Sequence, residues 1–109
     1  MGRTTLGDLE HQVLLATLRL RPAAYSVSVV TEITEQTGRE VAQSAVFIAL
    51  RRLEEKGLLH SRVEENVAGK SRVRRYFEPT PAGLERLRET RRALVRLWNG
   101  ITVELDGSQ

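Results

Sequence analysis

A helix with a well-defined end, followed at once by strand-like alternation, constrains the fold of this chain more than any other feature. The helix is predicted from about Ala42 to Lys56, and its apolar residues follow the spacing of one buried face: Val46, Ala49, Leu50 and Leu53. Gly57 suits the left-handed position just after a helix, and Leu58 is then placed to contact Leu53, as in a Schellman ending. The outward face carries two apolar side chains beside two guanidinium groups, and its members are Ser44, Phe47, Ile48, Arg51, Arg52 and Glu55.

That outward face indicates a surface for double-stranded DNA. Hydrocarbon side chains gain little from facing water alone. Beside guanidinium groups they suit a surface that contacts thymine methyls, guanine edges and phosphates. We therefore expect a DNA-binding protein.

The residue pattern after Gly57 changes to the period of two that is typical of strands. Alternation over 59–64 and over 72–77, with a turn-forming segment at 66–71 between them, predicts a short antiparallel hairpin. The six residues 70–75, where its second strand begins, contain four cations and no acid: Lys70, Arg72, Arg74 and Arg75. Such a cluster can neutralise several phosphates, although a solvated strand face explains it equally well. The net charge of +3 by itself favours a polyanionic partner only weakly.

Two further helices are predicted before this unit. The first covers about 6–20 and is apolar on two faces, one with Leu6, Leu9, Val13, Ala16 and Leu20 and the other with Leu14, Leu15 and Leu18. Arg21-Pro22 ends it, because the residue before a proline is pushed out of the helical region. The second runs from about Ser26 to Thr37, with Gly38 as its stop and an expected buried side of Val27, Val30, Ile33 and Thr34.

A last helix is predicted from Pro81, because Thr80 is a good cap and proline is tolerated at the first helical position. Leu87, Leu94 and Ile101 recur every seven residues along it, and Leu84, Arg91 and Trp98 form a companion series. An apolar seam on so small a domain is most simply buried against a second copy, and packing back onto the first helix is the alternative. We expect the interface of a homodimer to contain Leu6, Leu14, Leu18, Leu87, Leu94, Trp98 and Ile101.

The order of these elements predicts a mainly α fold with a small β-hairpin, the winged helix-turn-helix. It divides the chain into three parts. Residues 1–80 form the winged helix-turn-helix DNA-binding domain, 81–103 form a C-terminal dimerisation helix packed with the first helix, and 104–109 form a flexible tail.

The chain also resembles the PadR family of bacterial transcriptional regulators, over almost everything from Leu6 to about Gly100. The segments that carry the resemblance are Leu6-Gly7-Asp8-Leu9-Glu10, Ala24-Tyr25, Ala45-Val46-Phe47 with the run from Leu50 to Leu58, and the run from Arg74 to Gly83. The chain departs from the family in Ser26-Val27, in Ala42-Gln43-Ser44, in Phe47, where a tyrosine is usual, and in Pro79, where a leucine is usual. A proline there is tolerable only at the end or edge of a strand.

The resemblance implies a sequence-specific regulator, a repressor that binds a palindromic operator as a homodimer, with half-sites about one helical turn apart. It favours DNA contact over surface ion pairing for Arg51, and it places the third helix in the major groove with Gln43, Ser44, Phe47, Ile48 and Arg51 toward the bases. Gln43 suits adenine and Arg51 suits guanine or a phosphate, while Phe47 fits a partly buried core position equally well. Lys70, Arg72 and Arg74 are expected along the flanking backbone or in the minor groove.

Two aromatic residues have a second interpretation. In some members of the PadR family a tryptophan of the last helix lines a cavity between protomers that binds flat aromatic compounds. The resemblance therefore makes Trp98 a candidate ligand residue and a small aromatic molecule a candidate effector, although interface packing explains a lone tryptophan more simply. Tyr25 is interpreted as a core aromatic with its hydroxyl near a phosphate.

Other classes of protein fit the sequence poorly. The absence of cysteine excludes disulfides and thiolate zinc sites, and His11 and His60 are far apart, so we expect no metal and no cofactor. We find no catalytic motif, no signal peptide and no apolar run of membrane-spanning length, so we expect a cytoplasmic protein that is not an enzyme.

The alternative function is a winged-helix protein-interaction module without specific DNA binding, because Glu54-Glu55 and Glu64-Glu65 would oppose DNA.

Overall fold

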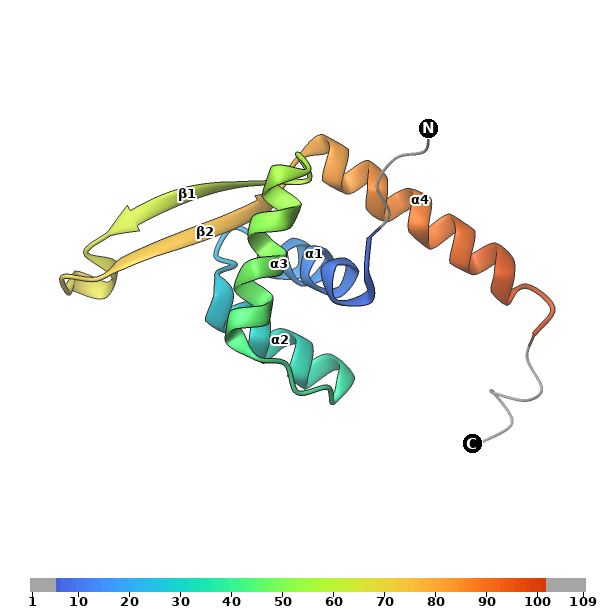
Figure 1. Cartoon of the computed structure of the whole chain (residues 1–109), viewed down its shortest axis with the longest axis horizontal. Helices are drawn as coiled ribbons and strands as arrows, with labels where there is room; N and C mark the ends of the chain where they lie inside the picture. The colour runs from blue at the N-terminus through green and yellow to red at the C-terminus, as the bar shows by residue number, and fades with distance from the viewer. Residues whose placement is uncertain (1–5, 102–109) are drawn as a thin grey trace.

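The computed structural model describes residues 6–101, which form four α-helices and a two-stranded antiparallel sheet (Figure 1). In chain order the elements are α1 (Asp8–Leu20), α2 (Ser26–Thr37), α3 (Gln43–Glu55), β1 (Leu59–Glu65), β2 (Val73–Pro79) and α4 (Pro81–Trp98). A turn of 3₁₀ helix, Val67–Gly69, joins the strands. This order confirms the predicted winged helix-turn-helix, in which α2 and α3 form the helix-turn-helix and β1 and β2 form the wing. The tail predicted at 104–109 lies outside the described residues.

The core lies where α1, α2 and α3 pack together at the base of the wing (Figure 1). The predicted buried stripe of α3 is confirmed, since all four of its members are buried: Val46, Ala49, Leu50 and Leu53. Phe77 anchors the wing to this core, because its side chain is only 1% exposed and its N–H donates to the carbonyl of Ala24 (2.8 Å). The base of the wing is therefore held at the start of α2 as well as by its chain connection to α3.

The predicted buried side of α2 is partly wrong. Val29 is fully buried and Ile33 nearly so, whereas Val27, expected inside, is exposed. Because α2 begins at Ser26, Val27 lies in its first turn and lines a groove beside β2. The stripe that packs against α1 and α3 begins two residues later, at Val29.

The placement of Leu14 at an interface between copies is also wrong. Leu14 is fully buried beside Val13 in the core of the protomer, so it has no surface to offer a second copy. Leu15 and Leu18, from the same predicted face, line a groove against α4 instead. Leu6 is partly buried against the core.

The end of α3 and the start of α4 share one set of hydrogen bonds. The predicted Schellman ending is confirmed, with the N–H of Leu58 donating to the carbonyl of Leu53 (2.9 Å) and Gly57 in left-handed backbone at a φ of 78°. The predicted cap is confirmed too, since the Thr80 hydroxyl accepts from the N–H of Gly83 (3.0 Å). The same hydroxyl donates to the carbonyl of Gly57 (2.7 Å), and the N–H of Thr80 donates to the carbonyl of Leu58 (3.0 Å). The direction of α4 is thereby fixed relative to α3.

α4 leaves the body of the protein after its first turns (Figure 1). Its residues 91–98 are all exposed, among them four large apolar side chains: Leu94, Val95, Leu97 and Trp98. Within the described part of the chain, α4 therefore does not fold back along its whole length onto α1. The wing and α4 project from opposite sides of the three-helix body (Figure 1).

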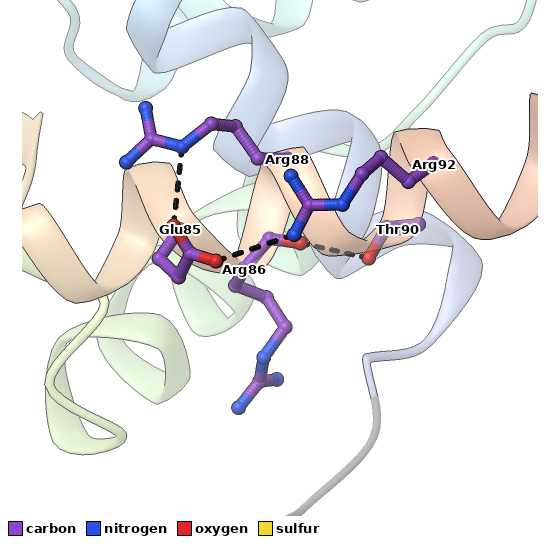
Figure 2. Close-up of polar contacts among 5 residues, drawn as sticks. All are labelled: Glu85, Arg86, Arg88, Thr90 and Arg92. Atoms are coloured by element: carbon purple, nitrogen blue, oxygen red, sulfur yellow. Dashed lines mark hydrogen bonds and ion pairs between the residues drawn. The ribbon is translucent and has the colours of Figure 1, made fainter.

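Polar contacts within α4 support this projecting helix (Figure 2). Glu85 accepts hydrogen bonds from Arg88 (3.1 Å) and Arg92 (3.4 Å), and the hydroxyl of Thr90 donates to the carbonyl of Arg86 (3.0 Å). The bond from Arg88, together with that from Arg92, lowers the pKa of Glu85 below its ordinary value. These contacts join residues three to seven positions apart, so they stabilise the helix itself rather than its packing.

Candidate nucleic-acid interface

An open groove of about 440 Å³ lies between the N-terminus of α2, the outward face of α3 and strand β2. Its lining combines aromatic, aliphatic and guanidinium groups from all three elements: Tyr25, Ser26, Val27, Phe47, Arg72, Val73, Arg74, Arg75 and Phe77. The fold thus places residues of the third helix beside residues of the wing that are more than 20 positions away in the sequence. Phe47, Arg72 and Arg74, all expected to contact DNA, share this groove.

The outward face of α3 presents all five predicted contact residues to solvent: Gln43, Ser44, Phe47, Ile48 and Arg51. Phe47 is 42% exposed and Ile48 is 51% exposed, which are large fractions for such apolar side chains. Phe47 therefore lies at the rim of the groove and not in the core. An exposed helical face with apolar groups beside a guanidinium has the chemistry needed to read base edges in a major groove.

The polar side chains of this face are held only by weak surface contacts. The Gln43 amide donates to the hydroxyl of Ser26 at 3.4 Å, which links the N-termini of α3 and α2. Arg51 lies 3.7 Å from a carboxylate oxygen of Glu54, and its guanidinium carbon is 6.0 Å from the centroid of the Phe47 ring. Exposed contacts of this kind are each worth less than about 1 kcal/mol. They can therefore be exchanged for contacts to a base or a phosphate.

The cations of the wing differ in how firmly they are held. Lys70 and Arg72 are exposed near the tip. Arg74 is partly buried, with its guanidinium carbon 3.9 Å from the centroid of the Tyr25 ring. The core interpretation of Tyr25 therefore missed its contact with the wing. The sequence held no direct signal for this contact, because it depends on where the hairpin lies against α2.

Arg75 lies on the opposite face of the wing from Arg74. It donates to the hydroxyl of Ser61 (2.9 Å), which in turn donates to a carboxylate oxygen of Glu54 (2.6 Å). This chain of bonds ties β2, β1 and α3 together. Because successive residues of a strand point to opposite faces, Arg74 and Arg75 separate, and Arg74 pairs with Glu64 while Arg75 pairs with Val63.

Two of the four acidic residues expected to oppose DNA, Glu54 and Glu64, are engaged by other side chains of the protein. Glu54 is bound by Ser61 and lies near Arg51, and Glu64 lies 3.5 Å from Arg62. A carboxylate beside a cation opposes an approaching phosphate less than an isolated one does. The pairing of Glu54 and Glu64 therefore reduces the repulsion between this surface and a phosphate.

A second groove, of about 400 Å³, lies between α1 and α4 and is mostly apolar. Four of the residues expected at a dimer interface line it: Leu18, Leu87, Leu94 and Trp98. Trp98 is 50% exposed here, and Ile101 is exposed beyond the end of the helix. Leu15 was not among the residues expected at the interface, and it lines the α1 side of this groove together with Leu18.

The described residues hold no arrangement that suggests a metal centre or a membrane segment. Over residues 6–101 no group of three or more histidine, aspartate or glutamate side chains is placed to bind a metal ion. Over the same residues no helix is both long and apolar enough to span a bilayer.

The chain matches the transcriptional regulator PadR-like family over residues 14–89. Among solved structures it is similar to a PadR family transcriptional regulator from Eggerthella lenta, with 31% identity, 82% of this chain and 76% of that chain covered, and a TM-score of 0.66. It is also similar to a PadR-like transcription factor from Bacteroides fragilis, with 24% identity, 82% of each chain covered and a TM-score of 0.70. Bacillus subtilis PadR in complex with operator DNA shares the fold at 17% identity, with 77% of this chain and 47% of that chain covered and a TM-score of 0.65. None of the curated proteins compared with the chain matches it.

Proposed function

Because the chain belongs to the PadR-like family of transcriptional regulators, we propose that it binds double-stranded DNA sequence-specifically with α3 in the major groove. One observation supports this most: Phe47, Ile48 and Arg51 project together from the exposed face of α3, beside a groove lined by wing cations. The similar fold of the Bacillus subtilis protein, which was solved with operator DNA, supports DNA binding by a fold of this kind. A transcriptional regulator acts at the chromosome, so we propose that this protein works in the cytoplasm.

In this proposal α3 contacts the bases and the wing contacts the phosphates. Gln43 pairs with adenine, Arg51 with guanine or a phosphate, Ser44 with either a base or the backbone, and Phe47 and Ile48 meet thymine methyls. Lys70, Arg72 and Arg74 neutralise phosphates of the flanking backbone. The helix therefore supplies sequence preference, and the wing supplies affinity that falls with salt.

We further propose that the protein binds DNA as a homodimer formed through α4. The apolar residues of α4 that line the groove against α1 are the support, Leu94 and Trp98 among them, because a monomer in water would leave them exposed. A second copy of α4 has the complementary apolar seam. Two-fold symmetry of the dimer then requires a palindromic operator with half-sites about one helical turn apart.

The regulatory part of the proposal is a repressor relieved by a small aromatic molecule. The groove beside Trp98 supports it, since it is apolar, of ligand size and lined by an indole that is half exposed. Trp98 is the only tryptophan, so its fluorescence reports on the groove directly. Quenching by flat aromatic compounds at micromolar concentrations supports an effector site, and no response to a broad panel contradicts it.

The proposed function is tested by recovering preferred duplexes from a random pool with the full chain. We expect one inverted repeat, bound with an affinity that falls steeply with salt. Changing Lys70, Arg72 and Arg74 together to alanine should lower the slope of log affinity against log salt by about 2 to 3, at about 0.9 per lost phosphate contact. The preferred sequence should stay the same, because phosphate contacts do not read bases. Absence of any preference over random duplex would contradict the proposal and favour a protein-interaction module.

A further inference from the structure

We propose that Tyr25 is a positioning residue for DNA binding, because its ring holds the guanidinium of Arg74 in place between α2 and the wing. The inference rests on the proposed DNA binding and adds a residue that sequence analysis placed in the core. Four side chains carry it: Arg62, Tyr76, Tyr25 and Arg74.

The four side chains form one continuous stack. The guanidinium carbon of Arg62 lies 4.7 Å from the centroid of the Tyr76 ring, and that of Arg74 lies 3.9 Å from the centroid of the Tyr25 ring. The two rings meet edge to face, with centroids 5.8 Å apart and planes inclined at 75°. Arg74 also donates to the hydroxyl of Tyr76 (3.4 Å). Both distances from cation to ring are within the range of a cation–π contact.

The strand register explains why these groups meet. Arg62 pairs with Tyr76 across the two strands, and Arg74 lies two residues from Tyr76 along β2, so all three point to one face of the wing. Tyr25 comes from outside the wing, at the residue that precedes α2. The stack therefore joins the wing to the helix-turn-helix.

The backbone of Tyr25 is fixed independently of the wing. Its N–H donates to the hydroxyl of Ser28 (3.0 Å), and its carbonyl accepts from the N–H of Val29 (2.9 Å). A further anchor on the wing side is Arg62, which donates to the carbonyl of Pro22 (3.1 Å). Tyr25 is thus a fixed platform, and the stack sets where Arg74 stands relative to the groove.

Holding Arg74 in place matters because an arginine loses much rotamer freedom when it binds a phosphate. A guanidinium already stacked on a ring has lost part of that freedom before DNA arrives, so less affinity is lost on binding. The edges of a stacked guanidinium remain able to donate hydrogen bonds. Arg72 is a natural comparison, because it is exposed and has no aromatic partner among the described residues.

A double-substitution cycle on operator affinity tests the coupling. We expect Tyr25→Leu to lower affinity about three- to tenfold and Tyr25→Phe to change it less than twofold, because the ring is what the cation needs. Combined with Arg74→Ala, Tyr25→Leu should add little further loss, whereas combined with Arg72→Ala the two losses should multiply. Losses that multiply in both pairs would overturn the positioning role and leave Tyr25 as ordinary packing.

A second measurement uses the free protein and needs no DNA. The δ-methylene protons of Arg74 should resonate upfield of their random-coil position, because they lie over an aromatic ring. The shift should disappear in Tyr25→Leu and persist in Tyr25→Phe. An unshifted Arg74 in the unsubstituted protein overturns the inference even if Tyr25→Leu fails to fold. A shifted Arg74 in a protein that binds no duplex would overturn the proposed function instead, so the two failures are distinguishable.

Discussion

Gly83 shows how one residue fixes the start of α4. A Cβ atom at this position would lie 2.2 Å from the carbonyl oxygen of Leu58, far inside van der Waals contact. That oxygen also accepts from the N–H of Thr80, so it has no freedom to move away. Gly83 is therefore required by close packing, and not by its backbone angles.

Gly83→Ala tests this requirement. We expect the free energy of unfolding, measured with urea, to fall by about 1–3 kcal/mol or more, because the clash is with backbone. Gly7→Ala is the matched control, since a Cβ there meets nothing within 4 Å and the φ of Gly7 is −73°. The control should change stability by less than about 1 kcal/mol. Equal effects of the two substitutions would show that α4 does not begin against Leu58.

At the scale of helices and strands, Thr80 links the end of α3 to the start of α4. Its hydroxyl caps α4 and also donates to the carbonyl of Gly57, just beyond α3. Since α4 carries the proposed interface between copies and α3 the proposed contact with bases, the spacing of two α3 helices in a dimer depends on this junction. The proposed spacing of the half-sites therefore depends in part on Thr80, which lines neither the groove beside the wing nor the groove between α1 and α4.

Thr80→Val keeps the shape of the side chain and removes both bonds. We expect the free energy of unfolding to fall by about 1–2 kcal/mol, the usual cost of losing an N-cap. Thr31→Val is a suitable control, because Thr31 is exposed on α2 and makes no hydrogen bond within the described residues that the substitution would remove. Its effect should stay within about 0.5 kcal/mol. A loss in the control as large as that in Thr80→Val would contradict the capping role.

Helix and strand positions were easier to predict from the sequence than the side of each helix that packs inward. The buried stripe of α3, its glycine stop and the cap at Thr80 all follow local rules, and the structure confirms them. Pro79 is the last residue of β2, where proline does not interrupt pairing. Val27 and Leu14 were misplaced because α1 and α2 carry apolar residues on several sides, so periodicity alone did not show which side packs inward. The contact between Tyr25 and Arg74 depends on how distant elements dock, which no local pattern encodes.

At the scale of the whole molecule, the wing and α4 extend from opposite sides of the core (Figure 1). The wing shares one groove with α3, while α4 ends in a stretch of exposed apolar side chains. In a protomer of this shape the proposed DNA-binding surface and the proposed interface between copies are separate. Substitutions on α3 and the wing should therefore leave dimerisation measurable.

Leu94→Glu tests the surface on α4. A carboxylate in the apolar groove should raise the dissociation constant of the dimer at least about a hundredfold, because burying an unpaired charge is costly. Leu97→Glu makes the same change on the same helix outside the groove, at a residue that is 71% exposed, and should leave the dimer intact. Sedimentation of both variants gives the assembly state. A stable dimer of Leu94→Glu would place the interface elsewhere.

DNA contact by α3 and the wing is tested by a map of backbone amide chemical shifts as the selected duplex is added to the full chain. We expect the largest changes at 43–51 and 70–76, where α3 and the wing face the shared groove. α4 offers a competing basic surface, an open depression lined by Arg88, Arg91, Arg92, Arg96 and Val95. Changes centred on that depression, with 43–51 unaffected, would contradict DNA binding through α3 and the wing.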